Sequence, residues 1–210
     1  KEWQLQFAIR SAPPSAEVVT TLDSVIARNG DFTIGPLTAQ VLRGDRVALV
    51  GANGSGKTTL LQALLGERPV ASGRISWGTR VQLGVLDQAR AGIAGERSLV
   101  DEVAAALSET DAGAVRTLLA KFGLGPDHIA RACDSLSLGE RTRAALAVLQ
   151  GRAVNVLVLD EPTNHLDAAA IDQLQEALLA FDGTLFIVTH DRALLDALAP
   201  SVVWRFSRSE

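Results

Sequence analysis

The stretch Gly51-Ala-Asn-Gly-Ser-Gly-Lys-Thr58 matches the pattern G-x-x-x-x-G-K-[ST], a glycine-rich loop that ends in a lysine and a hydroxyl residue. The apolar residues 47–50 before it predict a buried strand, and residues 57–65 after it predict a helix that ends at Gly66. Glycines let successive backbone N–H groups curl around phosphate oxygens, and the helix N-terminus adds a favourable dipole. The order of strand, loop and helix therefore predicts a phosphate-binding site.

The residues of this loop have distinct expected roles. Lys57 is expected to meet the outer phosphates of a nucleotide, and Thr58 to offer its hydroxyl to Mg²⁺. The remaining candidates for nucleotide binding are Gly51, Asn53, Gly54, Ser55, Gly56 and Thr59. The alternative is a flexible glycine turn without a ligand. From average residue usage, however, a chance match is expected in only about one chain in a hundred of this length.

Two acidic residues follow the apolar run at residues 154–159. Asp160 and Glu161 would emerge at the C-terminal edge of a central strand, where ligands bind in open α/β sheets. Asp160 is predicted to hold the Mg²⁺ shell, and Glu161, on the opposite side of the chain, to orient or deprotonate an attacking water. Alone, the pair is explained equally well as solvated acids that end a strand. Beside a phosphate loop, the catalytic interpretation is favoured.

The order of the other predicted elements indicates an α/β fold. Residues 1–42 alternate apolar and polar over short stretches, as in residues 3–7, and their prolines and glycines predict short antiparallel strands and turns. Further strands are predicted at residues 81–86, 154–159 and 184–189. Helices are predicted at residues 98–107, 114–122, 137–150, 168–181 and 191–198. Strands that alternate with helices predict a parallel sheet covered on both faces.

Composition limits the class of protein. The chain has 210 residues, 47% of them hydrophobic and 21% charged, which is typical of a globular domain with a full core. No apolar run reaches the roughly 18 residues that span a bilayer, so no direct membrane insertion is expected. The net charge of −4 gives no global attraction for nucleic acid. A single cysteine, Cys133, and the lack of zinc-ligand spacing favour a reducing compartment, and we expect a cytoplasmic location.

Three further segments occur in a recognisable order along the chain. Gln88 follows a predicted strand, Leu136-Ser-Leu-Gly-Glu140 opens a predicted helix, and His190 follows the last predicted strand. With the phosphate loop and the two acids, they resemble the Q-loop, signature and switch histidine of an ATP-binding cassette (ABC) domain. The segment 161–167 contains Asn164-His165-Leu166, a form typical of the soluble tandem-cassette branch called ABC-F and not of most transporters. The chain resembles an ABC-F cassette over nearly its whole length.

The resemblance implies the fold of a P-loop NTPase with a mostly parallel core sheet, an N-terminal antiparallel β part and a small helical subdomain. Residues 1–210 would form one ABC ATPase domain. Its antiparallel part would cover residues 1–45, its P-loop core residues 46–88 and 151–210, and its helical subdomain with the signature residues 89–150. The implied cofactors are ATP and Mg²⁺, and the isolated domain is expected to have low ATPase activity.

The resemblance also implies roles for the added motifs. Gln88 would bridge the metal and the lytic water, His190 would contact the γ-phosphate and that water, and Asp167 would couple two composite sites. The signature residues that would face ATP on another cassette are Ser137, Leu138, Gly139 and Glu140. A capped helix N-terminus can serve as such an anion site. Alone, each residue has a simpler explanation: Gln88 as a polar strand end, His190 as a loop histidine and Asp167 as a helix cap.

Two positions depart from the family pattern. Leu138 stands where the commoner signature has its first glycine, which adds a side chain beside the expected phosphate contact. For the aromatic residue that stacks on adenine in many cassettes, this chain offers two candidates, the ring of Phe32 and the guanidinium plane of Arg28. Outside the motifs, His128 is predicted to be a solvated surface residue, and Arg141 with Arg143 a solvated helix face.

The interval at residues 89–135 leaves no room for the long arm inserted in many first ABC-F cassettes, so the resemblance implies a second cassette. The chain lacks methionine and begins at Lys1, and we interpret it as a piece of a longer protein. The first expected partner is a second cassette, either from the same full-length chain or from a second copy in a homodimer. The second is the ribosome with its rRNA, which would be contacted through regions outside this piece.

The leading function is the ATPase half of a soluble ABC-F protein. It would bind two MgATP between head-to-tail cassettes and act on the ribosome, as a translation factor or in antibiotic resistance by ribosome protection. One alternative is the ATPase subunit of an ABC transporter, against which Asn164-His165-Leu166 argues. The other is an ATP-gated clamp without turnover, against which the intact Glu161 argues.

Overall fold

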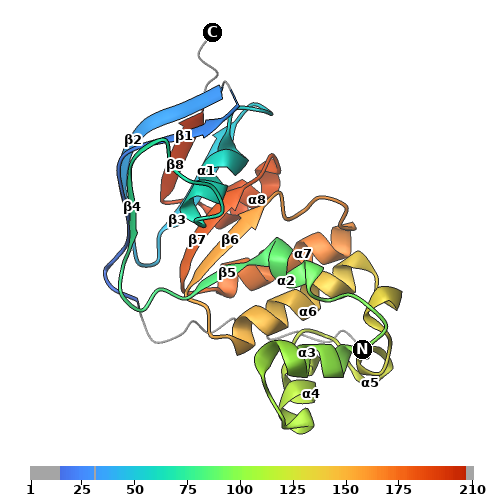
Figure 1. Cartoon of the computed structure of the whole chain (residues 1–210). Helices are drawn as coiled ribbons and strands as arrows, with labels where there is room; N and C mark the ends of the chain where they lie inside the picture. The colour runs from blue at the N-terminus through green and yellow to red at the C-terminus, as the bar shows by residue number, and fades with distance from the viewer. Residues whose placement is uncertain (1–14, 31, 207–210) are drawn as a thin grey trace.

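The computed structural model describes residues 15–30 and 32–206. It contains two sheets, the larger of which is covered on both faces (Figure 1). The alternating segment at residues 3–7 lies outside the described residues. Among those described, no helix is both long and apolar enough to cross a membrane.

The smaller sheet is antiparallel and has the strand order β2-β1-β4. Its strands are β1 (Val18–Asn29), β2 (Phe32–Leu42) and β4 (Ser72–Trp77). The long strands β1 and β2 confirm the antiparallel structure predicted near the N-terminus. β4 comes from outside that region and was not predicted, because its mostly exposed residues have little apolar alternation. Pairing with β1, in which Leu22 lies opposite Ile75, brings it into the sheet.

The larger sheet is parallel, as predicted, and has the strand order β5-β6-β7-β3-β8. Its strands are β3 (Arg46–Gly51), β5 (Leu83–Val85), β6 (Val156–Asp160), β7 (Thr184–Val188) and β8 (Val202–Phe206). The strand predicted at residues 81–86 is shorter because a helix begins at Leu86, and β8 was not predicted. Since β7 lies between β6 and β3, the C-terminal ends of these three strands meet at one edge.

Most helices begin where the sequence predicts. They are α1 (Lys57–Leu64), α2 (Leu86–Ala91), α3 (Leu99–Leu107), α4 (Ala112–Lys121), α5 (Pro126–Ile129), the 3-10 helix η1 (Cys133–Ser135), α6 (Leu138–Gly151), α7 (Ala168–Ala180) and α8 (Arg192–Leu198). The carboxylates of Asp167 and Asp191 cap α7 and α8 by accepting backbone N–H groups at 2.8 and 3.0 Å. The helix α2 was not predicted, and it includes Gln88.

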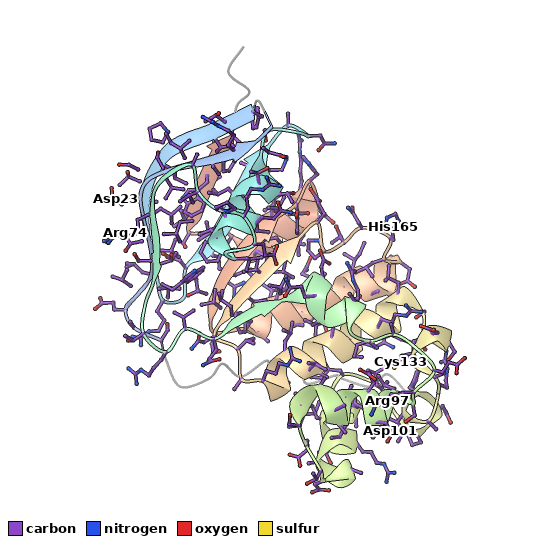
Figure 2. The ribbon with its side chains drawn as sticks, in the orientation of Figure 1. Asp23, Arg74, Arg97, Asp101, Cys133 and His165 are labelled. Carbon is purple, nitrogen blue, oxygen red and sulfur yellow. The ribbon has the colours of Figure 1, made fainter. Side chains whose placement is uncertain are left out.

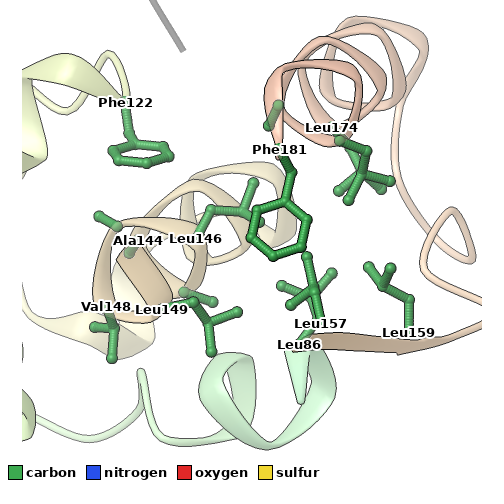
Figure 3. Close-up of a cluster of buried hydrophobic side chains, with 14 of the residues drawn as sticks. Leu86, Phe122, Ala144, Leu146, Val148, Leu149, Leu157, Leu159, Leu174 and Phe181 are labelled. Carbon is green, nitrogen blue, oxygen red and sulfur yellow. The ribbon is translucent and has the colours of Figure 1, made fainter. Parts of the chain in front are cut away.

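The parallel sheet separates two hydrophobic cores. On β6, Leu157 and Leu159 face a core shared with α6 and α7, whereas Val156 and Val158 face a core shared with α1 and the antiparallel sheet. This alternation is the period of two residues expected of a strand. Figure 3 shows the first core, in which side chains of the sheet and of α6 and α7 gather around the ring of Phe181. Burial on both faces sets the register of β6, at whose end the two predicted acids lie.

Candidate functional site

The loop that joins β3 to α1 is held in a curled conformation. Gly54 and Gly56 have φ angles of +74° and +95°, in the left-handed region that glycine adopts without strain. A Cβ atom at Gly56 would overlap the side chain of Ile34 on β2, so a larger residue would push the loop away from the antiparallel sheet. The loop therefore has both the backbone freedom and the close packing that a phosphate cradle requires.

Lys57 is folded back onto this loop. Its Nζ donates hydrogen bonds to the carbonyl oxygens of Gly51 at 2.8 Å and Ala52 at 2.9 Å, and only 6% of the residue is exposed. The hydroxyl of Ser55 is also buried here, and within the described chain its Oγ has no hydrogen-bond partner. The loop thus holds the ammonium group of Lys57 in place without a ligand.

Thr58 and Asp160, which are 102 residues apart in sequence, meet at the start of α1 and the end of β6. The Thr58 hydroxyl donates to Asp160 Oδ2 at 2.8 Å. Burial raises the pKa of Asp160 above its ordinary value, assisted by the charge of Asp87 and opposed by the Thr58 hydrogen bond and the charge of Lys57. A hydroxyl and a carboxylate are hard oxygen ligands that suit Mg²⁺.

The protein donors that would hold Mg²⁺ are few. In residues 15–30 and 32–206, no group of three or more His, Cys, Asp and Glu side chains could hold a metal ion. Mg²⁺ usually takes one or two protein ligands and completes its shell with water and substrate phosphates, and does not need an all-protein cage. The Thr58 and Asp160 pair therefore fits a metal that is delivered with a nucleotide.

Glu161 and His190 lie side by side after β6 and β7. Glu161 has a φ of +46°, and its backbone N–H donates to the Val188 carbonyl at 2.7 Å. Its Oε1 lies 3.3 Å from His190 Nε2, and its Oε2 accepts the His190 backbone N–H at 3.3 Å. A non-glycine residue in the left-handed region is uncommon and often marks a functional position. The turn directs the Glu161 carboxylate toward His190. In this position the carboxylate can act as a proton acceptor.

These residues surround one cavity of about 380 Å³. Its lining consists of Asn29, Phe32, Asn53, Gly54, Gly56, Lys57, Thr58, Thr59, Asp160, Glu161, Val188 and His190. Asn29 and Val188 were not predicted, because they belong to no motif and reach the cavity through the ends of β1 and β7. Of the predicted loop residues, Gly51 and Ser55 do not line the cavity. Most of the predicted site is therefore gathered in one place.

Gln88 does not line this cavity. It lies in α2, its Nε2 donates to Glu67 Oε1 at 2.5 Å, and it lines a second cavity of about 250 Å³ together with Leu83 and Arg152. The helix starts at Leu86, directly after β5, and carries the Gln88 side chain to that cavity. The structure thus brings the loop, the two acids and His190 together but leaves Gln88 outside.

The two candidates for adenine stacking differ in position. Phe32 lines the cavity beside the loop, whereas Arg28 is exposed on β1 and does not line it. We expect Phe32→Ala to weaken MgATP affinity by about tenfold, because loss of base stacking on an aromatic ring typically costs about 1–3 kcal/mol. Titration calorimetry would measure the effect, and Arg28→Ala should leave the affinity unchanged.

A second variant separates stacking from packing, because Phe32 also packs against the buried Ile34. Phe32→Leu keeps most of the apolar contact but cannot stack on a purine, and it should lose as much affinity as Phe32→Ala. Affinity retained in Phe32→Leu would contradict the stacking role.

The predicted signature lies away from this cavity, at the start of α6. Ser137 and Glu140 form the capping box that the sequence predicts, and Gly139 packs against Ala170 of α7. Asp167, which caps α7, is exposed, and so is His165 in the preceding loop (Figure 2). None of these residues lines the nucleotide cavity of the same chain.

Three residues near the signature were predicted to be solvated but are half-buried: His128, Arg143 and Arg141, whose guanidinium donates to the carbonyls of Leu136 and Asp134. His128 is half-buried, not solvated, and its Nε2 lies 3.3 Å from Glu140 Oε1. Arg143 is also half-buried, and it donates to Gln173 Oε1 at 2.8 Å. Burial lowers the pKa of Arg143, although the charges of Glu140 and Asp167 oppose this effect. Neither the His128 contact nor the Arg143 contact has a local sequence signal, because each partner lies on another element.

Comparisons with known proteins show the family of the chain. A family model described as ABC transporter matches residues 34–164. The ATP-binding protein Uup of Escherichia coli is 37% identical over 193 residues, which cover 90% of this chain and 30% of Uup. The probable ATP-binding cassette sub-family F member 3 homolog of Encephalitozoon cuniculi is 31% identical over 194 residues, covering 92% of this chain and 34% of the homolog. The chain thus spans about a third of the length of these relatives.

Among solved structures, cbiO1 from Clostridium perfringens, part of the ABC transporter complex cbiONQ, has a similar fold. The TM-score is 0.74 at 22% sequence identity, and the superposition covers 91% of this chain and 85% of cbiO1. At that identity the likeness concerns the fold, namely a five-stranded parallel sheet, a three-stranded antiparallel sheet and helices.

Proposed function

The chain belongs to the ABC transporter family of ATP-binding cassette domains, and from this premise we propose that it is the ATP-hydrolysing cassette of a soluble ABC-F protein that acts on the ribosome. One observation carries the hydrolytic part of the proposal. A single cavity holds the loop lysine Lys57, the Thr58 and Asp160 pair and the carboxylate of Glu161. Phosphate binding, metal binding and proton transfer can therefore occur within one site.

ATP would bind with its phosphates in the loop between β3 and α1. Lys57 would then exchange its hydrogen bonds to Gly51 and Ala52 for bonds to phosphate oxygens. Thr58 and Asp160 would hold Mg²⁺, which neutralises phosphate charge when bound. Their present hydrogen bond already places both oxygens on the same side of the loop.

Glu161 would accept the proton of the attacking water. A general base must lie within hydrogen-bond reach of the proton that it removes, and the cavity wall places its carboxylate next to the phosphate loop. His190, in contact with both carboxylate oxygens of Glu161, would keep that carboxylate oriented and contact the γ-phosphate. Gln88 would reach the site only after leaving Glu67, through a movement of α2.

The signature would complete the site of another cassette. Ser137 and Gly139 begin α6, whose N-terminus is suited to a phosphate, yet they do not line the cavity of their own chain. A head-to-tail pair would bring each signature over the loop of the partner, with Asp167 between the two sites. The isolated domain would then hydrolyse ATP slowly, and the expected partner is a second cassette.

Two features support the ABC-F branch. The segment Asn164-His165-Leu166 lies in a loop in which Asn164 and His165 are exposed, and relatives that include a sub-family F homolog match about nine-tenths of this chain. The short interval between Gln88 and the signature supports a second cassette. Within this branch we propose a cytoplasmic protein that serves translation or antibiotic resistance by ribosome protection. The alternative is the ATPase subunit of an ABC transporter.

Sucrose-gradient sedimentation with ribosomes tests this proposal. The full-length protein carrying Glu161→Gln, which should retain ATP, is expected to sediment with ribosomes with ATP and not without it. The salt concentration is kept fixed because affinity for RNA depends on it. Lys57→Met provides the matched control, since it should lose ATP binding and therefore co-sedimentation. A Glu161→Gln protein that binds ATP but stays at the top of the gradient would favour the transporter subunit.

A further inference from the structure

The N-terminus of α6 carries a negative charge at the place where a phosphate is expected. Glu140 Oε2 accepts the Ser137 backbone N–H at 2.7 Å, and Ser137 Oγ accepts the Glu140 backbone N–H at 3.2 Å. This capping box leaves the N–H groups of Leu138 and Gly139 without an acceptor in the described chain. Those two groups can bind an anion, but an ionised carboxylate beside them repels it.

Glu140 is ionised at neutral pH. Burial acts to raise its pKa, but the hydrogen bond from the Ser137 N–H and the nearby Arg131 guanidinium outweigh burial and hold the pKa below its ordinary value. Only 15% of the Glu140 side chain is exposed, so water screens its charge poorly. An incoming phosphate would therefore meet this charge unless a cation compensates it.

Arg131 is that cation. Its Nη1 donates to Glu140 Oε1 at 3.1 Å, and the same oxygen lies 3.3 Å from His128 Nε2. His128 Nδ1 is buried and has no hydrogen-bond partner among the described residues. Arg131 donates a hydrogen bond to the Glu140 carboxylate, whereas the Arg143 guanidinium donates to Gln173 and interacts with Glu140 only through its charge.

Arg131 is itself held in place. Its guanidinium donates to both the carbonyl and the hydroxyl of Ser135, the residue that ends η1. On the other side, Arg141 donates to the carbonyls of Leu136 at 3.2 Å and Asp134 at 3.0 Å. Two arginines thus hold the three carbonyls that precede Ser137, and the bonds to Ser135 keep Arg131 close to Glu140.

We propose that Arg131 is a positioning residue that cancels the charge of Glu140, so that the N-terminus of α6 can accept the phosphates of a nucleotide bound to a second cassette. The inference rests on the proposed function, because it requires a nucleotide shared between two cassettes. Arg131 acts through Glu140 and does not itself touch the nucleotide.

The test uses the 210-residue chain carrying Glu161→Gln, with a second copy of the chain as the partner cassette. Sedimentation velocity over a range of protein concentrations measures association with and without MgATP. Adding Arg131→Gln should weaken the MgATP-dependent association by about tenfold, because one uncompensated charge faces the phosphates. The affinity of the monomer for MgATP should not change. Arg116→Gln, which removes an exposed charge from α4, should leave association unchanged.

A double variant separates charge compensation from a purely structural role. Adding Glu140→Gln to Arg131→Gln removes the repelling charge while glutamine keeps the capping box, so association should return to within about threefold of the reference. The inference would be overturned if Arg131→Gln left the MgATP-dependent association unchanged. It would also be overturned if Arg131→Gln weakened this association and Glu140→Gln did not restore it. If the reference chain with Arg131 intact fails to associate with MgATP, two copies of this chain do not share a nucleotide, and the inference is overturned for a pair of identical cassettes.

Discussion

Replacing Glu161 by glutamine is expected to lower the steady-state rate of ATP hydrolysis by about 10²–10⁴-fold, the usual contribution of a general base. Glutamine has nearly the same shape but cannot accept a proton at neutral pH. Its side chain can still accept the His190 backbone N–H that Glu161 now accepts at 3.3 Å, so the turn after β6 should be preserved. ATP should therefore still bind and remain unhydrolysed.

Phosphate release measures the rate, and equilibrium binding of MgATP measures the retained affinity. Glu176→Gln is a matched control, because Glu176 is exposed on α7 and does not line the cavity. Equal rates for wild type and Glu161→Gln would contradict the catalytic role of Glu161. If turnover in the wild type were itself negligible while ATP still drove association, an ATP-gated clamp would explain the protein better.

Replacing Lys57 by methionine is expected to weaken MgATP affinity by about a hundredfold. Removing one partner of a buried charge pair typically costs about 2–5 kcal/mol, and tenfold in affinity corresponds to about 1.4 kcal/mol. Lys57 Nζ already lies in the loop, 2.8 and 2.9 Å from two carbonyl oxygens, so it needs only a short movement to reach a phosphate. Methionine keeps the apolar stem of the buried side chain and removes the charge.

Isothermal titration calorimetry with MgATP would measure this loss. Lys121→Met removes the charge of an exposed lysine at the end of α4 and should not change the affinity. Thermal unfolding of both variants without nucleotide would show whether the loop remains folded. If the Lys57→Met variant is folded and binds MgATP as tightly as the wild type, the phosphate-binding role of the loop is contradicted.

Much of this site was predictable because its residues are close in sequence to a strand end. The loop from Gly51 to Thr58 follows β3 directly, and Asp160 and Glu161 follow β6 directly. Parallel strands place their C-terminal ends at one edge of the sheet, so two segments about a hundred residues apart could be expected to meet. The hydrogen bond between Thr58 and Asp160 is consistent with that expectation.

Other features depend on pairings that leave little trace in sequence. β4 and β8 are short and half exposed, and they become strands because β1 and β3 offer them partners. Gln88 was predicted from its resemblance to the Q-loop of ABC domains, but α2 begins one residue after β5 and carries its side chain to Glu67. The direction of a side chain on a short helix depends on its neighbours, which sequence spacing does not specify.

The amino-acid sequence by itself determined the α/β class, the parallel sheet, the phosphate loop and the pair of acids, since each depends on local periodicity or on a motif within a few residues. The tertiary structure alone decided which residues share the cavity and which partners the signature receives. Phe32 and not Arg28 lines that cavity, and Glu140 meets Arg131 beside the signature. These contacts follow from the packing of whole elements in three dimensions, where burial and charge act between side chains that are distant along the chain.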